Sequence, residues 1–200
     1  MDTGYAYFAG GNVYFDTSRL DHYYVFNDHD EDDLAVGVRE GVEEDTNKRN
    51  KNDFVLWFTK SKFENQALKW DSPWGVGYPG WHIECSAMSN KYLGETIDIH
   101  GGGQDLTFPH HENEIAQTEA YTGKKFSNYW MHNAYITIDN EKMSKSKGNF
   151  FTVRDILEKY TGEEIRYFLL SGHYRSPINF SEELMAQARS ALGRMHNAEN

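Results

Sequence analysis

Short runs of hydrophobic residues along the chain alternate with polar residues in the manner of strands. Aromatic-rich runs at 5–8 and 13–15 flank Ala-Gly-Gly-Asn at 9–12, a pattern that predicts a β-hairpin. The apolar run at 53–58 predicts a buried strand, although so short a run has no period that distinguishes a strand from a helix. Alternation at 96–100 predicts a further strand, so short strands are expected throughout the first half of the chain.

Helices are expected around and after these strands. Trp81 and Cys85 lie four residues apart and share a face of one helix, and Pro109 opens a second helix. Three later helix starts are predicted from a hydroxyl residue at the N-cap. Thr152 with Asp155 and Thr161 with Glu164 resemble capping boxes, and Ser181 is expected to cap the last helix. The last helix is expected to line one face with Leu184, Ala188, Leu192 and Met195. The alternating residues 129–138 predict a strand that leads into a lysine-rich loop.

The order of elements over 80–114 is helix, strand, glycine turn and helix, which is typical of a nucleotide site in an α/β fold. Gly101, Gly102 and Gly103 would form the turn, because residues without a Cβ let the backbone approach a ligand closely. The following helix offers free N–H groups to anionic or polar atoms. Asp105 has the position of an acid that binds ribose hydroxyls or an ammonium group. A plain loop also uses glycines, so both interpretations stay open.

Composition narrows the class of protein. Two hundred residues suffice for one sizeable domain, or most of one. The net charge of −11 argues against broad, nonspecific nucleic-acid binding, so any such contact has to be local. A single cysteine excludes an intramolecular disulfide framework and suits a reducing cytosol. The sequence predicts neither a signal peptide nor a membrane span, and we expect a cytoplasmic protein.

The stretch 27–53 is polar and acidic. It fails as a calcium-binding loop, because Asp33 stands where glycine is needed and Arg39 stands where the bidentate glutamate should be. We therefore expect a solvated loop there.

Cys85, His110 and Glu114 form a candidate metal site. A thiolate, an imidazole and a carboxylate are ligand types that zinc accepts, and three protein ligands with one open position are typical of a catalytic site. His110 and Glu114 are four residues apart, so a helix places both on one face. His111 with Glu114, at a spacing of three, is a weaker alternative pair. The plainer alternative is a buried cysteine beside a solvated helix start.

The stretch 141–149 looks like a mobile cationic loop. It holds Lys142, Lys145 and Lys147 among small residues and ends in Gly-Asn. Such a loop can neutralise charge that builds on a triphosphate as it is attacked. Taken alone, a solvated basic turn explains the same residues.

Longer motifs are more specific evidence of a family than single residues are. The pentapeptide at 142–146 is, letter for letter, the KMSKS signature of class I aminoacyl-tRNA synthetases. The segments GWHIECSAM at 80–88 and DIHGGGQDLTFPHHENEIAQ at 98–117 resemble the cysteine-specific branch of that family. Further similar segments lie at 4–16, 70–75, 132–133 and 148–157. The resemblance covers nearly the whole chain, in order, apart from the acidic stretch.

The resemblance implies an α/β fold, namely the C-terminal half of a class I Rossmann-like catalytic domain. Residues 1–52 would end a β-rich connective insertion with its hairpin and acidic loop. Residues 53–140 would form the second half of the nucleotide-binding catalytic domain, with its zinc site. Residues 141–180 would hold the KMSKS loop and the helices after it, and 181–200 would begin a helical stem.

The resemblance also implies a reaction. Cysteine would react with ATP, as its Mg²⁺ complex, to give cysteinyl-adenylate, and the cysteinyl group would then move to tRNA(Cys). The ligands of a Zn²⁺ ion that takes the sulfur of the substrate would be Cys85, His110 and Glu114. Lys145 would contact the ATP phosphates, with Lys142 assisting catalysis. The residues facing adenosine or the amino acid would be Trp81, His100, Gly102, Gly103 and Asp105. A monomer without membrane contact is expected.

Two parts of the family pattern are absent from the chain. The HIGH motif occurs nowhere, and no second cysteine is present to complete a zinc shell. We therefore expect a piece of a longer enzyme, lacking the HIGH half and the anticodon-binding domain, that does not aminoacylate tRNA alone. One rival is a related ligase that joins activated cysteine to an amino-sugar. The other is a non-catalytic paralogue that binds zinc or a nucleotide.

Overall fold

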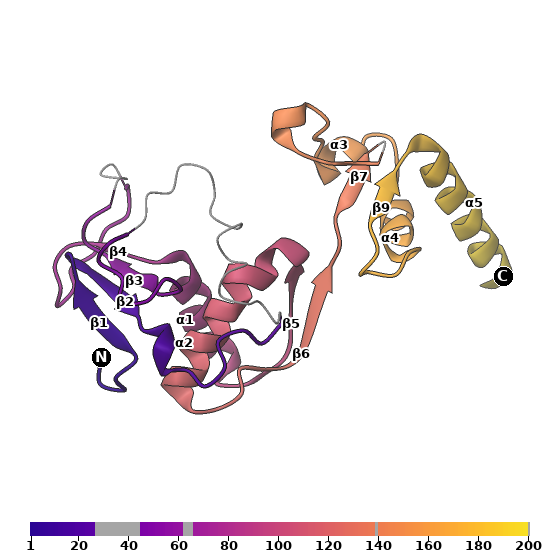
Figure 1. Ribbon diagram of the computed structural model, residues 1–200. Coiled ribbons are helices and arrows are strands. Elements are labelled where there is room, and N and C mark those ends of the chain that lie inside the picture. The colour runs from indigo at the N-terminus through magenta and orange to yellow at the C-terminus, as the bar shows by residue number, and fades with distance from the viewer. Residues whose placement is uncertain (27–44, 62–65, 139, 200) are drawn as a thin grey trace. The chain divides into compact units, whose positions relative to one another are not determined.

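A computed structural model describes residues 1–26, 45–61, 66–138 and 140–199 (Figure 1). The chain divides into two compact units. The first unit comprises 1–100 with 106–130, and the second comprises 101–105 with 131–200. Most of the acidic stretch considered above, and with it the rejected calcium loop, lies outside the described residues. Within the described ranges, no helix is both long and apolar enough to cross a membrane.

The first unit begins with a four-stranded antiparallel sheet in the order β1-β2-β3-β4. The predicted hairpin is confirmed: Ala9 pairs with Asn12, and the two glycines between them have φ of 59° and 99°, as a tight turn requires. The predicted strand at 53–58 is confirmed as β3. The bounds are β1 Ala6–Ala9, β2 Asn12–Phe15, β3 Phe54–Phe58 and β4 Tyr78–Pro79, with a short helix η1 at Thr17–Arg19.

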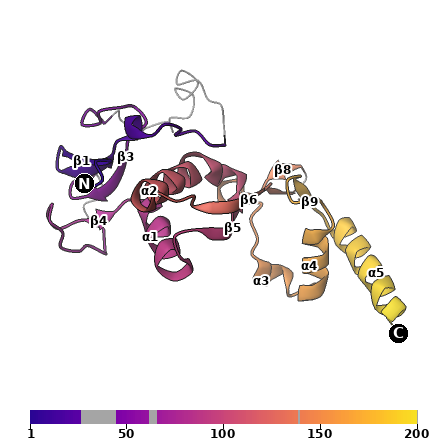
Figure 2. The ribbon, with the colours of Figure 1, turned by 90° about the horizontal axis from the view of Figure 1, so that it is seen from below.

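Two helices of the first unit, α1 (Trp81–Leu93) and α2 (Glu112–Thr122), pack against each other (Figure 2). Strands β5 (Ile97–Gly103) and β6 (Ser127–Asn133) form a two-stranded sheet. Apolar residues from strands and helices make two buried clusters. One contains Phe15, Phe54 and Ala116, and the other contains Ile97, Ile115 and Phe126.

One of two expectations for this region was wrong. The glycines at 101–103 continue strand β5 and do not form a turn. A Cβ at Gly101 would lie 3.3 Å from the carbonyl oxygen of Met131, so glycine admits a close neighbouring backbone. The prediction that Pro109 opens the second helix is confirmed: Phe108 is extended, and from Pro109 the chain runs through the π-helical turn η4 (Thr107–His111) into α2.

The second unit contains a three-stranded sheet in the order β8-β7-β9, in which β7 is antiparallel to β8 and parallel to β9. Its strands are β7 Ile136–Ile138, β8 Glu141–Lys142 and β9 Ile178–Phe180. Its helices are α3 Val153–Ile156, α4 Gly162–Leu170 and α5 Glu182–Glu199, and short turns of helix lie at η3 Gln104–Leu106 and η5 Lys145–Lys147. The core of this unit joins α4 and α5 through Ile165, Phe168, Met185 and Ala188.

The helix starts of the second unit agree with the sequence. Both capping boxes are present, and the backbone N–H of Leu184 donates to the hydroxyl of Ser181. The single strand expected at 129–138 is wrong, because the N–H of Ala134 donates to the carbonyl of Tyr174 and separates β6 from β7. The apolar face of α5 is also partly wrong: Met185 is fully buried, whereas Met195 is 55% exposed.

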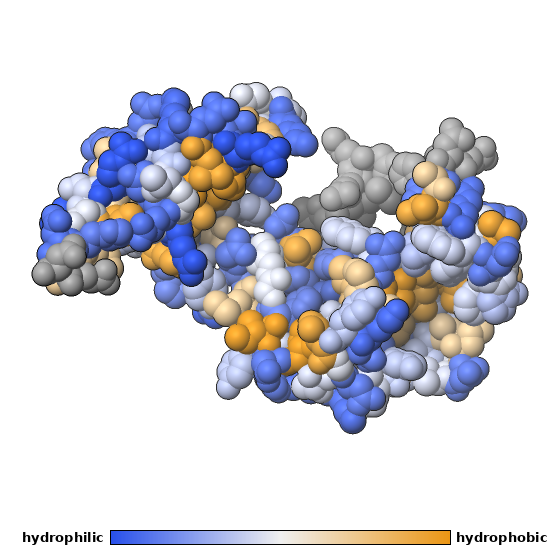
Figure 3. Space-filling view, turned by 180° about the vertical axis from the view of Figure 1, so that it is seen from behind, coloured by the Kyte–Doolittle hydropathy of each residue, from blue (hydrophilic) through white to orange (hydrophobic). Residues whose placement is uncertain are grey.

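Both units carry apolar side chains on their surfaces. Figure 3 shows these residues, in orange, as patches among hydrophilic ones. In the first unit, Trp57, Trp70 and Trp74 help to line a mostly apolar cavity of about 610 Å³. This cavity does not include the candidate ligands Cys85, His110 and Glu114.

Candidate functional site

The packing of α1 on α2 brings the three candidate metal ligands of the first unit together. Cys85 lies on α1, His110 lies in the π-helical turn before α2, and Glu114 lies in the first turn of α2. Ligand atoms of the three side chains, one from each, lie within 4.8 Å of one another. A hydrogen bond of 2.6 Å from Ser86 to Gln117 helps to fix the two helices at this point. The helix–helix contact thus joins residues separated by 25 positions or more in sequence.

Glu114 has unmet bonding capacity. Its carboxylate is buried, with 1% of the residue exposed, and its Oε2 lies 2.9 Å from Nε2 of His100. Its Oε1 has no hydrogen-bond partner among the described residues, and Nε2 of His110 is 3.7 Å from it. A buried carboxylate oxygen without a partner is costly, so a cation at this position would compensate the carboxylate. The donor set of sulfur, nitrogen and oxygen suits zinc.

His82, which the sequence analysis did not select, contacts this cluster. Its Nδ1 lies 2.8 Å from Nδ1 of His110, so one imidazole donates and the other accepts. Burial, with the neighbouring His110, lowers the pKa of His82 to about 4, and burial also lowers the pKa of His110. Both rings are therefore neutral at pH 7, as a metal-binding imidazole must be. In the sequence, the spacing of three residues between His82 and Cys85 was the signal that could have placed His82 beside the candidate ligands.

The Cys85 side chain is partly buried. Burial and the carboxylates of Glu114 and Glu84 raise the pKa of its thiol. The thiol is thus protonated when no cation is near, and a bound cation would favour the thiolate.

A second set of potential ligands shares Glu114. His100, His111 and Glu114 also bring ligand atoms within 4.8 Å of one another, and His111 lies 3.9 Å from Oε2 of Glu114. The ring of Trp130 packs on both histidines, at 4.6 and 5.1 Å between ring centroids. This set contains no thiol, and it approaches the oxygen that already bonds to His100. Oε1, which has no hydrogen-bond partner among the described residues, is instead 3.7 Å from Nε2 of His110, a member of the first set.

The other selected residues take varied positions. In the first unit, Trp81 is 57% exposed and its ring lies 4.4 Å from that of His110. In the second unit, Gly102 and Gly103 end strand β5, and Asp105 is exposed in η3. A Cβ at Gly103 would lie 2.5 Å from a carboxylate oxygen of Asp105, so glycine leaves room for that side chain.

The lysine loop of the second unit is closed by Asn149, a residue to which the sequence analysis gave no role. The Asn149 side chain accepts a hydrogen bond from the N–H of Ser144 at 2.9 Å and donates to the carbonyl of Lys142 at 3.4 Å. Lys142 and Lys145 are both exposed. The loop therefore presents two cations from a backbone that is tied to itself.

Comparison with known proteins gives consistent results. Residues 1–190 match the family model for the catalytic domain of class I (C) tRNA synthetases. A protein of Clostridioides difficile named cysteine–tRNA ligase is 60% identical over 196 residues, which cover 98% of this chain and 41% of the relative. A protein of the same name from Carboxydothermus hydrogenoformans is 55% identical over 197 residues, with the same two shares. The chain thus spans less than half the length of these relatives.

Among solved structures, the chain is similar to the LeuRS of a ternary complex with tRNA and LeuAMS from Agrobacterium radiobacter. The TM-score is 0.50 at 14% identity, over 70% of this chain and 22% of that chain, and this likeness concerns the fold alone. The fold, the family model and the relatives agree with the motifs. The resemblance drawn from the sequence is confirmed, and the chain belongs to the cysteine-type class I tRNA synthetase family.

Proposed function

We propose that this chain is part of a longer cysteine–tRNA ligase. That enzyme would join cysteine to the α-phosphate of ATP, supplied with Mg²⁺, with release of pyrophosphate, and would then transfer the cysteinyl group to the 3′ end of tRNA(Cys). The observation that carries the proposal is the cluster of Cys85, His110 and Glu114, found in a chain 60% identical to a relative of that name. Because the chain spans 41% of that relative, activity is assigned to the longer protein.

We propose Zn²⁺ as the ion of this cluster, with Cys85, His110 and Glu114 as its ligands. The chemistry of the donor set and the unpartnered Oε1 of Glu114 support this assignment. When bound, zinc supplies a Lewis-acid centre that prefers a thiolate to a hydroxyl ligand, which would select cysteine over serine. An apolar pocket alone discriminates such similar side chains weakly.

The remaining residues act on the substrates in this proposal. Lys145, assisted by Lys142, neutralises charge on the ATP phosphates. Trp81 forms a wall of the amino-acid pocket, beside His110. The proposed contacts to adenosine or the amino acid are Gly102, Gly103, Asp105 and His100, of which His100 already bonds to Glu114 through Nε2.

The domain boundaries stay proposals as well: an insertion to 52, catalytic residues at 53–140, the KMSKS loop and its helices at 141–180, and a stem from 181. We propose a monomer that acts in the cytoplasm.

The test compares the longer protein with the 200-residue chain. The longer protein is expected to bind about one zinc ion, to catalyse cysteine-dependent ATP–pyrophosphate exchange and to charge tRNA(Cys), and the short chain is expected to do neither reaction. Robust exchange by the short chain would contradict its assignment as an incomplete piece. Transfer of cysteine to an amino-sugar without tRNA charging would overturn the proposal in favour of that rival. Zinc binding by the longer protein without exchange would favour a binding module.

A further inference from the structure

The side chain of Lys142 lies over an aromatic ring. Its Nζ is 3.9 Å from the centroid of Tyr135. In the antiparallel pair of β7 and β8, Lys142 is opposite Thr137, so the two side chains share a face of the sheet. Tyr135 precedes Thr137 by two residues and is the diagonal neighbour of Lys142 on that face. The register of the sheet therefore places this ring under this ammonium.

The backbone around Tyr135 is fixed by the first residue of β9 and by the chain before that strand. The carbonyl of Tyr135 accepts from the N–H of Ile178 at 3.2 Å, and the N–H of Ala134 donates to the carbonyl of Tyr174 at 2.8 Å. Next along the face, the hydroxyl of Thr137 lies 3.2 Å from the side-chain oxygen of Asn179. The ring thus stands on a backbone that leads directly into β7 and is hydrogen-bonded to the first residue of β9.

Lys145, the other cation of the loop, is held differently. It lies in the short turn η5, outside the sheet, and its Nζ is 5.2 Å from the ring of Phe150, a residue that is 44% exposed. The two lysines are therefore held differently. The backbone of Lys142 is fixed in strand β8, and its ammonium group lies over the ring of Tyr135.

We propose that Tyr135 is a positioning residue that holds the Lys142 ammonium ready for a phosphate oxygen of ATP. This inference rests on the proposed function. A cation over a ring keeps its N–H groups on the far side free to donate, and less side-chain freedom is lost when an anion binds. An exposed pair of this kind changes an equilibrium about two- to fivefold.

The test is ATP–pyrophosphate exchange by the longer protein with Tyr135→Leu, Tyr135→Phe, Lys142→Ala and the double variant Tyr135→Leu/Lys142→Ala. Tyr135→Leu is expected to lower kcat/KM for ATP about two- to fivefold, with the KM for cysteine unchanged. Tyr135→Phe keeps the ring and is expected to match the wild type. In the Lys142→Ala background, Tyr135→Leu is expected to cause no further loss, because its effect passes through that lysine.

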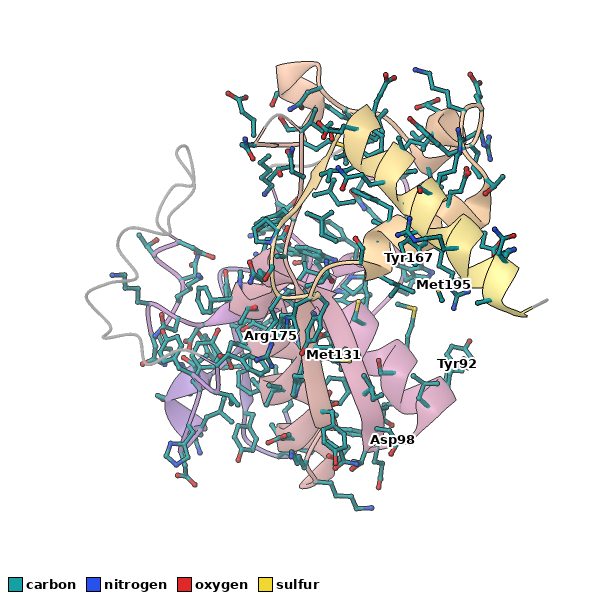
Figure 4. The ribbon with its side chains drawn as sticks, turned by 90° about the vertical axis from the view of Figure 1, so that its right-hand side faces the viewer. Tyr92, Asp98, Met131, Tyr167, Arg175 and Met195 are labelled. Atoms are coloured by element: carbon teal, nitrogen blue, oxygen red, sulfur yellow. The ribbon has the colours of Figure 1, made fainter. Side chains whose placement is uncertain are left out.

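A matched control lies on α1, where Nζ of Lys91 is 5.2 Å from the ring of Tyr92. Tyr92 is 72% exposed and points away from the ribbon (Figure 4). Tyr92→Leu removes the same kind of pair and is expected to leave exchange unchanged.

Three results would overturn the inference. One is wild-type exchange by Tyr135→Leu while Lys142→Ala is impaired, which would leave the proposed function intact. Another is an equal loss from Tyr135→Leu with and without Lys142, which would mean that the ring acts through the fold. The third is wild-type exchange by Lys142→Ala, which would also remove the role given to that lysine in the proposed function.

Discussion

Two buried carboxylates of the first unit, Asp53 and Glu114, are equally hidden from solvent but differently satisfied. Each residue is 1% exposed. Asp53 accepts hydrogen bonds on both oxygens, including those from the Tyr7 hydroxyl at 2.7 Å and the Thr17 N–H at 2.9 Å. Glu114 has one oxygen without a hydrogen-bond partner in the parts of the chain that the structure describes. Burial alone therefore does not distinguish these two carboxylates, whereas the unmet bonding capacity of Glu114 does.

Glu112 supports this distinction within a single helix. It is fully buried two residues before Glu114, yet its carboxylate accepts from the N–H groups of Val25 and Phe26 at 2.8–2.9 Å. The same turn of α2 therefore carries one carboxylate that anchors the chain and one with an oxygen left for a ligand.

The largest expected effect comes from removing the charge of Glu114. Partners that only orient metal ligands are worth about 10- to 100-fold, so Glu114→Gln, which alters a ligand itself, is expected to lower exchange by the longer protein ~1000-fold or more. Zinc content, measured by elemental mass spectrometry, should fall well below one ion. The control is Glu95→Gln, because the Glu95 side chain is 51% exposed and pairs with Lys124 at the surface. A Glu114→Gln variant with full zinc content would contradict the metal assignment.

Asp53→Asn should instead destabilise the fold and leave zinc binding unchanged. Since it breaks a buried network of charge-assisted hydrogen bonds, we expect the free energy of unfolding to fall by about 2–4 kcal/mol. Urea unfolding measures this change. Zinc content of the folded protein should stay at the wild-type value, and a loss of zinc without a loss of stability would remove the contrast with Glu114.

The contribution of Asp53 should also depend on pH. Burial alone would raise the pKa of Asp53, but the hydrogen bonds from Tyr7, Thr17 and Asn50 together lower it below 3.8. The stabilisation is therefore present above pH 3.8 and is lost as the pH falls below that value. Unfolding curves of the wild type and Asp53→Asn should converge on acidification, and a constant difference would show that ionisation of Asp53 contributes nothing.

A smaller effect is expected at His82, which contacts His110 of the cluster. His82→Phe keeps a ring but removes the partner of Nδ1 of His110. We expect about tenfold weaker zinc affinity, because partners of this kind orient a ligand and set its tautomer. Competition with a chelator measures it. Unchanged affinity would show that His82 only fills space.

The smallest effect is expected from a local contact in the second unit. Thr161→Ala removes the hydroxyl that caps α4, and we expect a loss of about 1 kcal/mol in unfolding free energy. Thr161→Ser, which keeps the hydroxyl, is the control. A loss as large as that of Asp53→Asn would mean that exposed and buried polar contacts are equivalent in this protein.

The features that the sequence predicted well depend on neighbours along the chain. Gly10 and Gly11 form a hairpin turn through their own φ angles, and Thr152 and Thr161 cap helices through bonds to residues three positions later. The errors fell where a distant segment intervened. The N–H of Ala134 bonds to Tyr174 and divides an otherwise regular alternation. Gly101 continues strand β5 so close to the neighbouring backbone that a Cβ would be 3.3 Å from the carbonyl oxygen of Met131.

By itself, the sequence determined the α/β class, the helix starts, the family and the identity of the candidate ligands Cys85, His110 and Glu114. Those features follow from local periodicity, short-range hydrogen bonds and motifs. Only the tertiary structure decided that α1 and α2 bring the ligands together, that His82 joins them, and that one oxygen of Glu114 has no partner among the described residues. The reason is physical: which bonds of a buried group are met depends on what packs against it, and no spacing along one chain segment records that packing.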